Sequence, residues 1–148
     1  MLRLAYVILA HHKPEQLGRL VRRLDDGHCL FYVHVDARSD IAPFLRNLAS
    51  ISCRRRIRFV QRRENGTWGH FGLTQAILNS LREVINGSEP VEYVLLLSGV
   101  DYPLVHPQFI HEKLARHQAN QIYLLHQPVD AEHTPHILPR LTHYYAPL

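Results

Sequence analysis

The fold of this chain is decided by the stretch C-L-F-Y-V-H-V at residues 29–35, which Asp36 follows directly. The stretch contains no Asp, Glu, Lys or Arg and is apolar almost throughout, which is typical of a strand covered on both faces in a parallel sheet. Similar runs occur on either side of it, L-R-L-A-Y-V-I-L-A at 2–10 and V-E-Y-V-L-L-L at 91–97, with a shorter I-R-F-V at 57–60. Together these runs predict the strands of one sheet.

Segments with helical spacing of apolar residues separate the strands. Pro14 begins the first helix, Ser39 and Asp40 cap the second, the third is expected at 69–86, and Pro107 begins the fourth. The side chains expected to face the sheet are Leu17, Leu20, Val21 and Leu24, then Ile41, Phe44, Leu45 and Leu48, then Leu73, Ile77, Leu81, Val84 and Ile85, and finally Phe109, Ile110 and Leu114. Strands that alternate with helices predict an α/β fold, an open and mostly parallel sheet with helices on both faces.

One domain fits the length of 148 residues. A fifth strand is expected at 121–125, so the predicted domain covers residues 1–126 and an irregular, proline-containing tail covers 127–148. A chain that is 46% hydrophobic and 20% charged is not of the disordered class. Its two cysteines, Cys29 and Cys53, are too few for a disulfide framework.

The net charge of +4 favours anionic partners. The main basic run consists of Arg54, Arg55, Arg56, Arg58, Arg62 and Arg63. We interpret it as a solvated face that could touch anionic lipid, in preference to a nucleic-acid-binding surface, because it lacks interleaved aromatic residues. The purely apolar runs, such as 4–10 and 93–97, are far shorter than the ~20 residues that span a bilayer, and no secretory signal is recognisable. The expected location is therefore cytoplasmic, with peripheral contact at the inner membrane surface as a variant.

Polar residues follow each predicted strand, at the edge where ligands bind in open α/β sheets. They are His11 and His12, then Asp36, then the loop Asn65 to Trp68, and finally Ser98 to Asp101. Neither a G-x-x-x-x-G-K-[ST] nor a G-x-G-x-x-G motif is present, so a nucleotide bound here would have its phosphates held in another way. The pattern predicts a nucleotide pocket at this edge.

Two carboxylates stand out, and each has two interpretations. Asp36 could accept hydrogen bonds from a ribose hydroxyl or a uracil N–H, or it could cap the turn that Ser39 and Asp40 complete. We favour Asp101 as the carboxylate that binds a ligand, because it follows Gly99, at which the backbone can approach a ligand closely. The alternative is that Asp101 forms a turn before Tyr102 and Pro103. His34 is expected to be a hydrogen-bonded core histidine.

Four ordered blocks then point to a family. They are A-Y-V-I-L-A-H-H-K-P-E-Q-L at 5–17, F-Y-V-H-V-D at 31–36, T-W-G-H-F-G-L-T-Q-A at 67–76, and L-L-L-S-G-V-D-Y-P-L at 95–104. In these blocks the chain resembles the core-2/I-branching glycosyltransferases, which include peptide O-xylosyltransferases.

The resemblance implies a GT-A-like, Rossmann-like domain that uses a UDP-sugar, with N-acetylglucosamine or xylose passing to a hydroxyl of a saccharide or other acceptor with inversion. It implies that Ala10, His11 and Asp36 hold the uridine, that Asn65, Thr67 and Trp68 approach the nucleotide, and that Ser98, Gly99 and Asp101 lie near the donor sugar. The family works without the metal-binding D-x-D motif, and Val100-Asp101-Tyr102 is not one, so no obligatory metal or other cofactor is expected.

In the family, the catalytic glutamate and the basic residues that neutralise the diphosphate lie in a C-terminal portion that this chain is expected to lack. The sheet is therefore expected to be incomplete at its C-terminus, and no catalytic residue is assigned. Arg62 or Arg63 could meet the diphosphate. A non-catalytic remnant or interaction module remains the alternative function, and a basic nucleic-acid-binding domain is the third. A metal ion could in principle be bound by side chains at adjacent strand ends, namely His11, His12, His34 and Asp36. We do not expect such a metal site.

Overall fold

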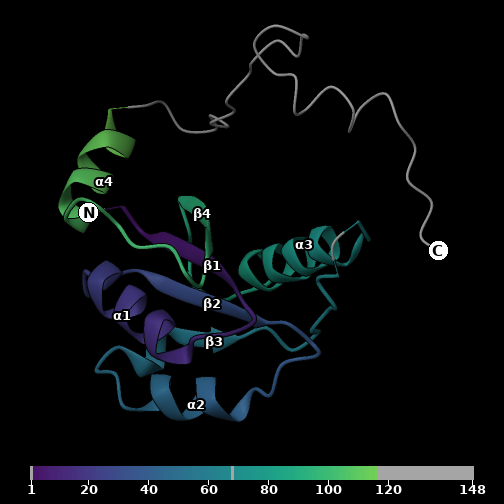
Figure 1. Cartoon of the computed structure of the whole chain (residues 1–148). Helices are drawn as coiled ribbons and strands as arrows, with labels where there is room; N and C mark the ends of the chain where they lie inside the picture. The colour runs from purple at the N-terminus through teal and green to yellow at the C-terminus, as the bar shows by residue number, and fades with distance from the viewer. Residues whose placement is uncertain (1, 68, 117–148) are drawn as a thin grey trace, which may run out of the picture.

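The computed structural model of the chain describes residues 2–67 and 69–116. Strands and helices alternate along it, as Figure 1 shows. The elements are β1 (Leu4–Ala10), α1 (Pro14–Leu24), β2 (Leu30–Val35), α2 (Ala42–Ala49), a 3-10 turn η1 (Arg54–Arg56), β3 (Ile57–Phe59), α3 (Gly72–Ile85), β4 (Tyr93–Ser98) and α4 (Pro107–Ala115). The predicted strand at 121–125 and the predicted tail at 127–148 lie outside the described residues.

The strands form one parallel sheet in the order β3-β2-β1-β4. β1 is central: Ala10 at its end pairs with Val35 of β2, and Leu9 pairs with Ser98 of β4. Because all strands run in the same direction, the polar residues that follow β1, β2 and β4 lie at one edge of the sheet. The predicted fold class, an open parallel α/β sheet of the Rossmann type consistent with a GT-A-like fold, is confirmed.

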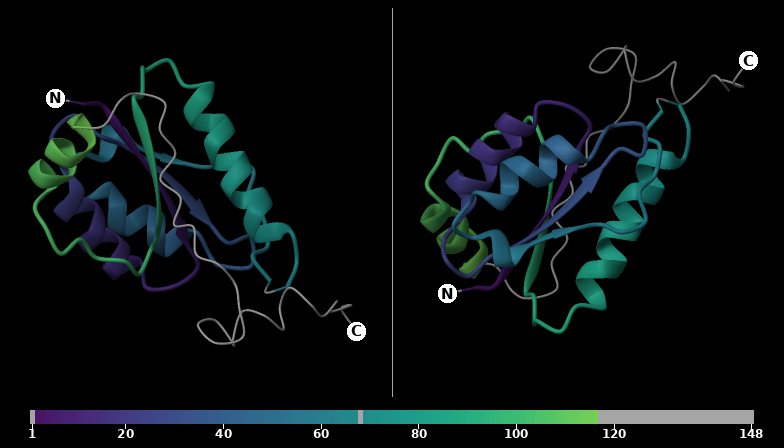
Figure 2. Two further views of the ribbon diagram at one scale, coloured as in Figure 1. Left: turned by 90° about the horizontal axis from the view of Figure 1, so that it is seen from above. Right: turned by 90° about the horizontal axis from the view of Figure 1, so that it is seen from below.

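Helices cover both faces of the sheet. Figure 2 shows α1, α2 and α4 on one face and α3 on the other. The side chains of β1 alternate accordingly, since Tyr6 and Ile8 pack in the core under α1 and α2, while Ala5 and Val7 pack with Val84 of α3. β1 and β2 are buried almost throughout, as their continuous apolar sequences predict.

The buried face of α3 differs from the predicted one. Val84 is buried as expected, but Leu73 is 51% exposed and Ile85 is 79% exposed, and the helix is buried at Ala76 and Ser80 instead. Two small side chains at i and i+4 let the helix lie close to the sheet, and the Ser80 hydroxyl donates to the carbonyl of Ala76 at 2.7 Å. The predicted stripe is therefore right for Val84 and for Leu81, which packs against the core, and wrong for Leu73 and Ile85.

Further side chains predicted to face the core are exposed. They include Leu45 on α2 and Phe109 on α4, while Phe44, Leu48 and the predicted residues of α1 are buried. On the edge strand β4, Val94 and Leu96 are exposed, whereas their neighbours Leu95 and Leu97 pack against the core under α1. Among the described helices, none combines the length and hydropathy needed to cross a membrane.

Candidate functional site

The site is built from the carboxyl ends of β1, β2 and β4. The N–H of Asp36 donates to the carbonyl of Ala10 at 2.8 Å, and the N–H of Gly99 donates to that of Leu9 at the same distance. The hydroxyl of Ser39 donates to the carbonyl of His11 at 2.7 Å. These bonds bring Ala10, His11, Asp36 and Gly99 together at one edge, as predicted from the strand ends.

Asp36 is the most connected side chain at this edge, and only 9% of its side-chain surface is exposed. Its Oδ1 accepts hydrogen bonds from the backbone N–H and the Nε of Arg38, at 2.9 and 3.1 Å. Its Oδ2 accepts from the N–H of Gly66 at 2.8 Å and from Nη2 of Arg38 at 3.2 Å. These bonds, above all those from the Arg38 side chain, hold the pKa of Asp36 well below its usual range.

The loop after β3 reaches the site through Gly66. Asn65 and Thr67, which flank it, are linked to each other, since Oδ1 of Asn65 accepts from the N–H and the hydroxyl of Thr67 at 3.0 and 2.6 Å. The bond from Gly66 to Asp36 therefore places this predicted nucleotide-binding loop next to the end of β2. Trp68, the remaining predicted residue of the loop, lies outside the described residues.

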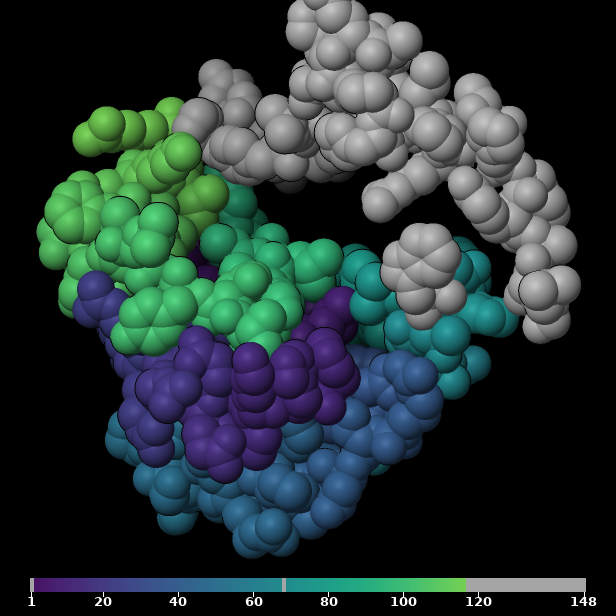
Figure 3. Space-filling view, in the orientation of Figure 1, coloured from purple at the N-terminus to yellow at the C-terminus, as the bar shows by residue number. Residues whose placement is uncertain are grey.

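Asp101 forms the turn after β4. Its Oδ2 accepts from the N–H of Ser98 at 2.8 Å, and its own N–H donates to the carbonyl of Ser98 at 3.0 Å. The turn-forming interpretation therefore has direct geometric support, and the aspartate is exposed to solvent. Figure 3 shows the segment after β4 against the start of α1, where Nε2 of Gln16 lies 3.5 Å from the carbonyl oxygen of Asp101.

Gly99 is required by a close approach of β1 and β4. A Cβ at this position would lie 2.9 Å from the Cβ of Ala10, which is closer than two carbon atoms pack. Asp36 and Gly99 thus lie on opposite sides of Ala10. Three surface hollows of the described chain lie elsewhere, and none of the three has a predicted site residue in its lining.

His34 is a buried, hydrogen-bonded histidine, in agreement with the prediction. Its Nε2 accepts from the N–H of Glu64 at 2.9 Å, which ties β2 to the loop after β3. Burial lowers the pKa of His34, so the neutral ring is favoured. His11 and His12 are exposed, with ring centroids 4.1 Å apart. Nε2 of His34 and both carboxylate oxygens of Asp36 already accept hydrogen bonds, and the expectation that these residues bind no metal ion stays a prediction.

The arginines near the site differ from the prediction. Arg63 donates to three backbone carbonyls, those of Val35, Asp36 and Ser39, at 2.5 to 2.9 Å, so it holds the end of β2 instead of facing outward. Arg62 pairs with Glu64. Contact of the exposed Arg54 and Arg55 with anionic lipid stays a prediction.

Sequence reasoning missed Arg38, and it predicted the loop Asn65 to Trp68 without singling out Gly66. The signal for Arg38 was its position two residues after an aspartate in the turn D-A-R-S. The signal for Gly66 was the presence of a glycine in the loop that follows the third strand. A Cβ on Gly66 would lie 3.0 Å from Oδ2 of Asp36.

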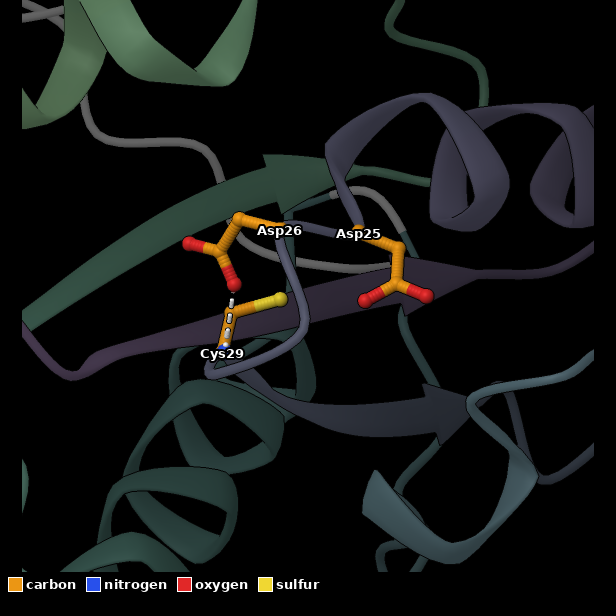
Figure 4. Close-up of side chains that lie close together, drawn as sticks. All are labelled: Asp25, Asp26 and Cys29. Carbon is orange, nitrogen blue, oxygen red and sulfur yellow. Dashed lines mark hydrogen bonds between the residues drawn. The ribbon is translucent and has the colours of Figure 1, made fainter.

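A second polar cluster lies at the opposite edge of the sheet, where Asp25 and Asp26 approach Cys29 (Figure 4). Arg56 pairs with Asp25 at 2.7 Å, and Nε2 of His111 on α4 lies 2.5 Å from Oδ2 of Asp26. Burial raises the pKa of the Cys29 thiol to about 12, so it is protonated at neutral pH. Asp25 is paired with Arg56, Asp26 is bonded to His111, and the neighbouring thiol is protonated, so this cluster is a polar network that contacts α4 and has its groups already partnered.

Comparisons with known proteins agree with the four sequence blocks. The family model described as Core-2/I-Branching enzyme matches residues 4–137. A human beta-1,3-galactosyl-O-glycosyl-glycoprotein beta-1,6-N-acetylglucosaminyltransferase is 29% identical over 101 residues, which are 68% of this chain and 24% of that protein. A mouse relative with the same description and the number 4 is 29% identical over 103 residues, 68% of this chain and 22% of that protein.

The chain thus spans about a quarter of the length of the curated relatives it matches. The family match covers all four strands and extends past α4. It includes the sheet edge at which Ala10, Asp36 and Gly66 meet. The chain therefore belongs to the core-2/I-branching enzyme family of glycosyltransferases.

Proposed function

We propose that this chain is the donor-binding part of a core-2/I-branching glycosyltransferase and holds a UDP-sugar at the carboxyl edge of its sheet. The observation that carries the proposal is the position of Asp36. Its backbone bonds to Ala10 at the end of β1, and its carboxylate bonds to Gly66 in the loop after β3. Three segments that the family resemblance assigns to the nucleotide therefore converge on one residue.

The proposed reaction is inverting transfer of the sugar to a hydroxyl of a saccharide acceptor. We favour UDP-N-acetylglucosamine over UDP-xylose as donor, because the relatives described above are N-acetylglucosaminyltransferases. Such a displacement requires a base for the acceptor hydroxyl and positive groups for the departing diphosphate. We assign no catalytic base within this chain, so donor binding is the activity proposed for it alone.

Binding is proposed to need no metal ion. In the turn after β4, Val100-Asp101-Tyr102 replaces a D-x-D pair, and one carboxylate oxygen of Asp101 is already bonded to the N–H of Ser98. The proposal predicts that a chelator leaves UDP affinity unchanged. A rise in affinity on adding Mn²⁺ would contradict it.

Calorimetric titration of the chain with UDP and AMP tests the function. UDP should bind and AMP should bind more weakly, and Asp36→Asn should weaken UDP binding while Asp40→Asn, an exposed carboxylate four residues away, should not. Equal affinity for UDP and AMP would favour a non-catalytic interaction module. Strong, steeply salt-dependent affinity for oligonucleotides would favour the nucleic-acid-binding alternative.

A further inference from the structure

The carboxylate of Asp36 has no acceptor position left for a ligand. A carboxylate offers about four lone-pair sites, and in Asp36 they receive the N–H of Gly66, the N–H of Arg38, and Nε and Nη2 of the Arg38 side chain. A ribose hydroxyl or uracil N–H can therefore bond to Asp36 only after one of these donors leaves.

The four donors differ in how easily they can leave. The N–H of Arg38 belongs to a turn that the bond from the N–H of Ser39 to the carbonyl of Asp36 also closes, and the N–H of Gly66 is fixed in the loop after β3. The Arg38 side chain is 58% exposed and has Asp36 as its sole ion-pair partner within 2–67 and 69–116. Among the four donors, only those of this exposed side chain can move without a change in the backbone, so the guanidinium is the group that a ligand can displace.

A displaced guanidinium would stay within reach of the ligand, because its backbone is only two residues from Asp36. Arg63, another cation at this edge, donates to three backbone carbonyls and has no comparable freedom. Guanidinium groups bind phosphate through the same paired N–H geometry that Arg38 uses on the carboxylate. A nucleotide supplies both a donor for Asp36 and an anion for Arg38, whereas a nucleoside supplies only the donor.

We propose that Arg38 is a specificity-determining residue that covers Asp36 in the free chain and moves to the phosphates of the ligand, so that the site selects nucleotides over nucleosides. This inference rests on the proposed function, since it requires a uridine nucleotide at Asp36. The inference assigns a phosphate contact to Arg38, next to the carboxylate of Asp36 that is proposed to bind uridine. Other parts of the enzyme can supply further cations for the phosphates.

The test compares uridine and UDP affinities of the whole chain by calorimetry. Arg38→Met removes the competing donors and the phosphate partner. Uridine should bind about two- to fivefold more tightly, because an ion pair whose arginine is exposed to solvent no longer competes, and the ratio of UDP to uridine affinity should fall. Arg38→Lys keeps a cation that cannot bridge both oxygens, so uridine affinity should rise while UDP affinity is retained. Arg46→Met, a matched loss of an exposed arginine on α2, should change neither.

The outcomes separate the two proposals. If the wild-type chain prefers UDP to AMP but Arg38→Met and Arg38→Lys leave uridine affinity and the UDP to uridine ratio unchanged, this inference is wrong and the proposed function stands. If the wild-type chain binds neither uridine nor UDP, both are wrong. Far-UV circular dichroism of each variant verifies that the fold is retained.

Discussion

The N–H of Gly66 donates a hydrogen bond of 2.8 Å to Oδ2 of Asp36, which lies 30 residues earlier in the chain. This bond joins the end of β2 to the loop between β3 and α3. Asp36 therefore has a structural role, which supports its interpretation as a turn-capping residue, while its role in binding stays a proposal.

The structural role predicts a loss of stability in Asp36→Asn. The carboxylate of Asp36 accepts from Arg38 and Gly66 through both of its oxygens, whereas the side-chain amide of Asn has one uncharged oxygen. The free energy of unfolding should therefore fall by about 1–3 kcal/mol. Urea denaturation measures it. Asp40→Asn is the control and should cost less than about 0.5 kcal/mol, because the Asn side-chain oxygen can accept from the N–H of Ala42 as Oδ1 of the exposed Asp40 does. Equal losses in the two variants would contradict the structural role.

His34 should make stability depend on pH. Its pKa is lowered in the fold by burial, so the unfolded chain binds a proton more readily, and stability must rise with pH over that interval. The contribution is complete above the ordinary value of 6.5 and is lost as the pH falls below it toward the lowered pKa. Melting temperatures of the wild type and His34→Gln between pH 5 and about 7.5 measure it. Gln keeps an acceptor for the Glu64 N–H without titrating, so its profile should be flatter; parallel profiles would refute the assignment.

The contact between Ala10 and Gly99 predicts a specific pair of effects. Gly99→Ala should destabilise the chain by about 1–3 kcal/mol, because the new methyl group would lie 2.9 Å from the Ala10 Cβ. Ala10→Gly removes that neighbour, so the double variant should regain part of the loss. Denaturant unfolding of the single and double variants gives the coupling between the sites. Additive losses would show that the two positions do not clash.

His111 should fasten α4 to the turn between α1 and β2. Replacing it by Ala removes one hydrogen-bond partner of Asp26, whose side chain is only 5% exposed and whose Oδ1 keeps the N–H groups of His28 and Cys29. The loss should cost about 1–3 kcal/mol, with faster amide exchange in 107–115. Hydrogen exchange by mass spectrometry measures the second effect. His28 is an exposed histidine in the same turn, so His28→Ala is the control. The double variant with Asp26→Asn and His111→Ala should lose less free energy of unfolding than the sum of the losses in the two single variants. Unchanged exchange in α4 would show that apolar contacts alone hold it.

The strands and the sheet edge were predictable from local patterns. The apolar runs at 4–10 and 30–35 identify buried parallel strands, and the residue after each run must lie at the ligand edge. The contacts that Arg38 and Gly66 make with Asp36 were not predictable. They depend on the side-chain conformation of Arg38 and on the path of the loop that places Gly66 next to Asp36. The burial of Ala76 and Ser80 on α3 was missed because these residues pack through their small size, which a count of apolar residues does not detect.

The position of α4 has a consequence for how the sheet can continue. The connections from β1 to β2 and from β2 to β3 pass over the face that carries α1 and α2, and the return from β3 to β4 passes over the opposite face with α3, so all three turn in one sense. α4 lies on the same face as α1. A parallel strand added directly after it at the free edge of β4 would reverse that handedness, which crossover connections almost never do. If the sheet of this family continues past β4, the next strand to pair with β4 should therefore be antiparallel to it, or the strand after α4 should lie further from β4 than the neighbouring position.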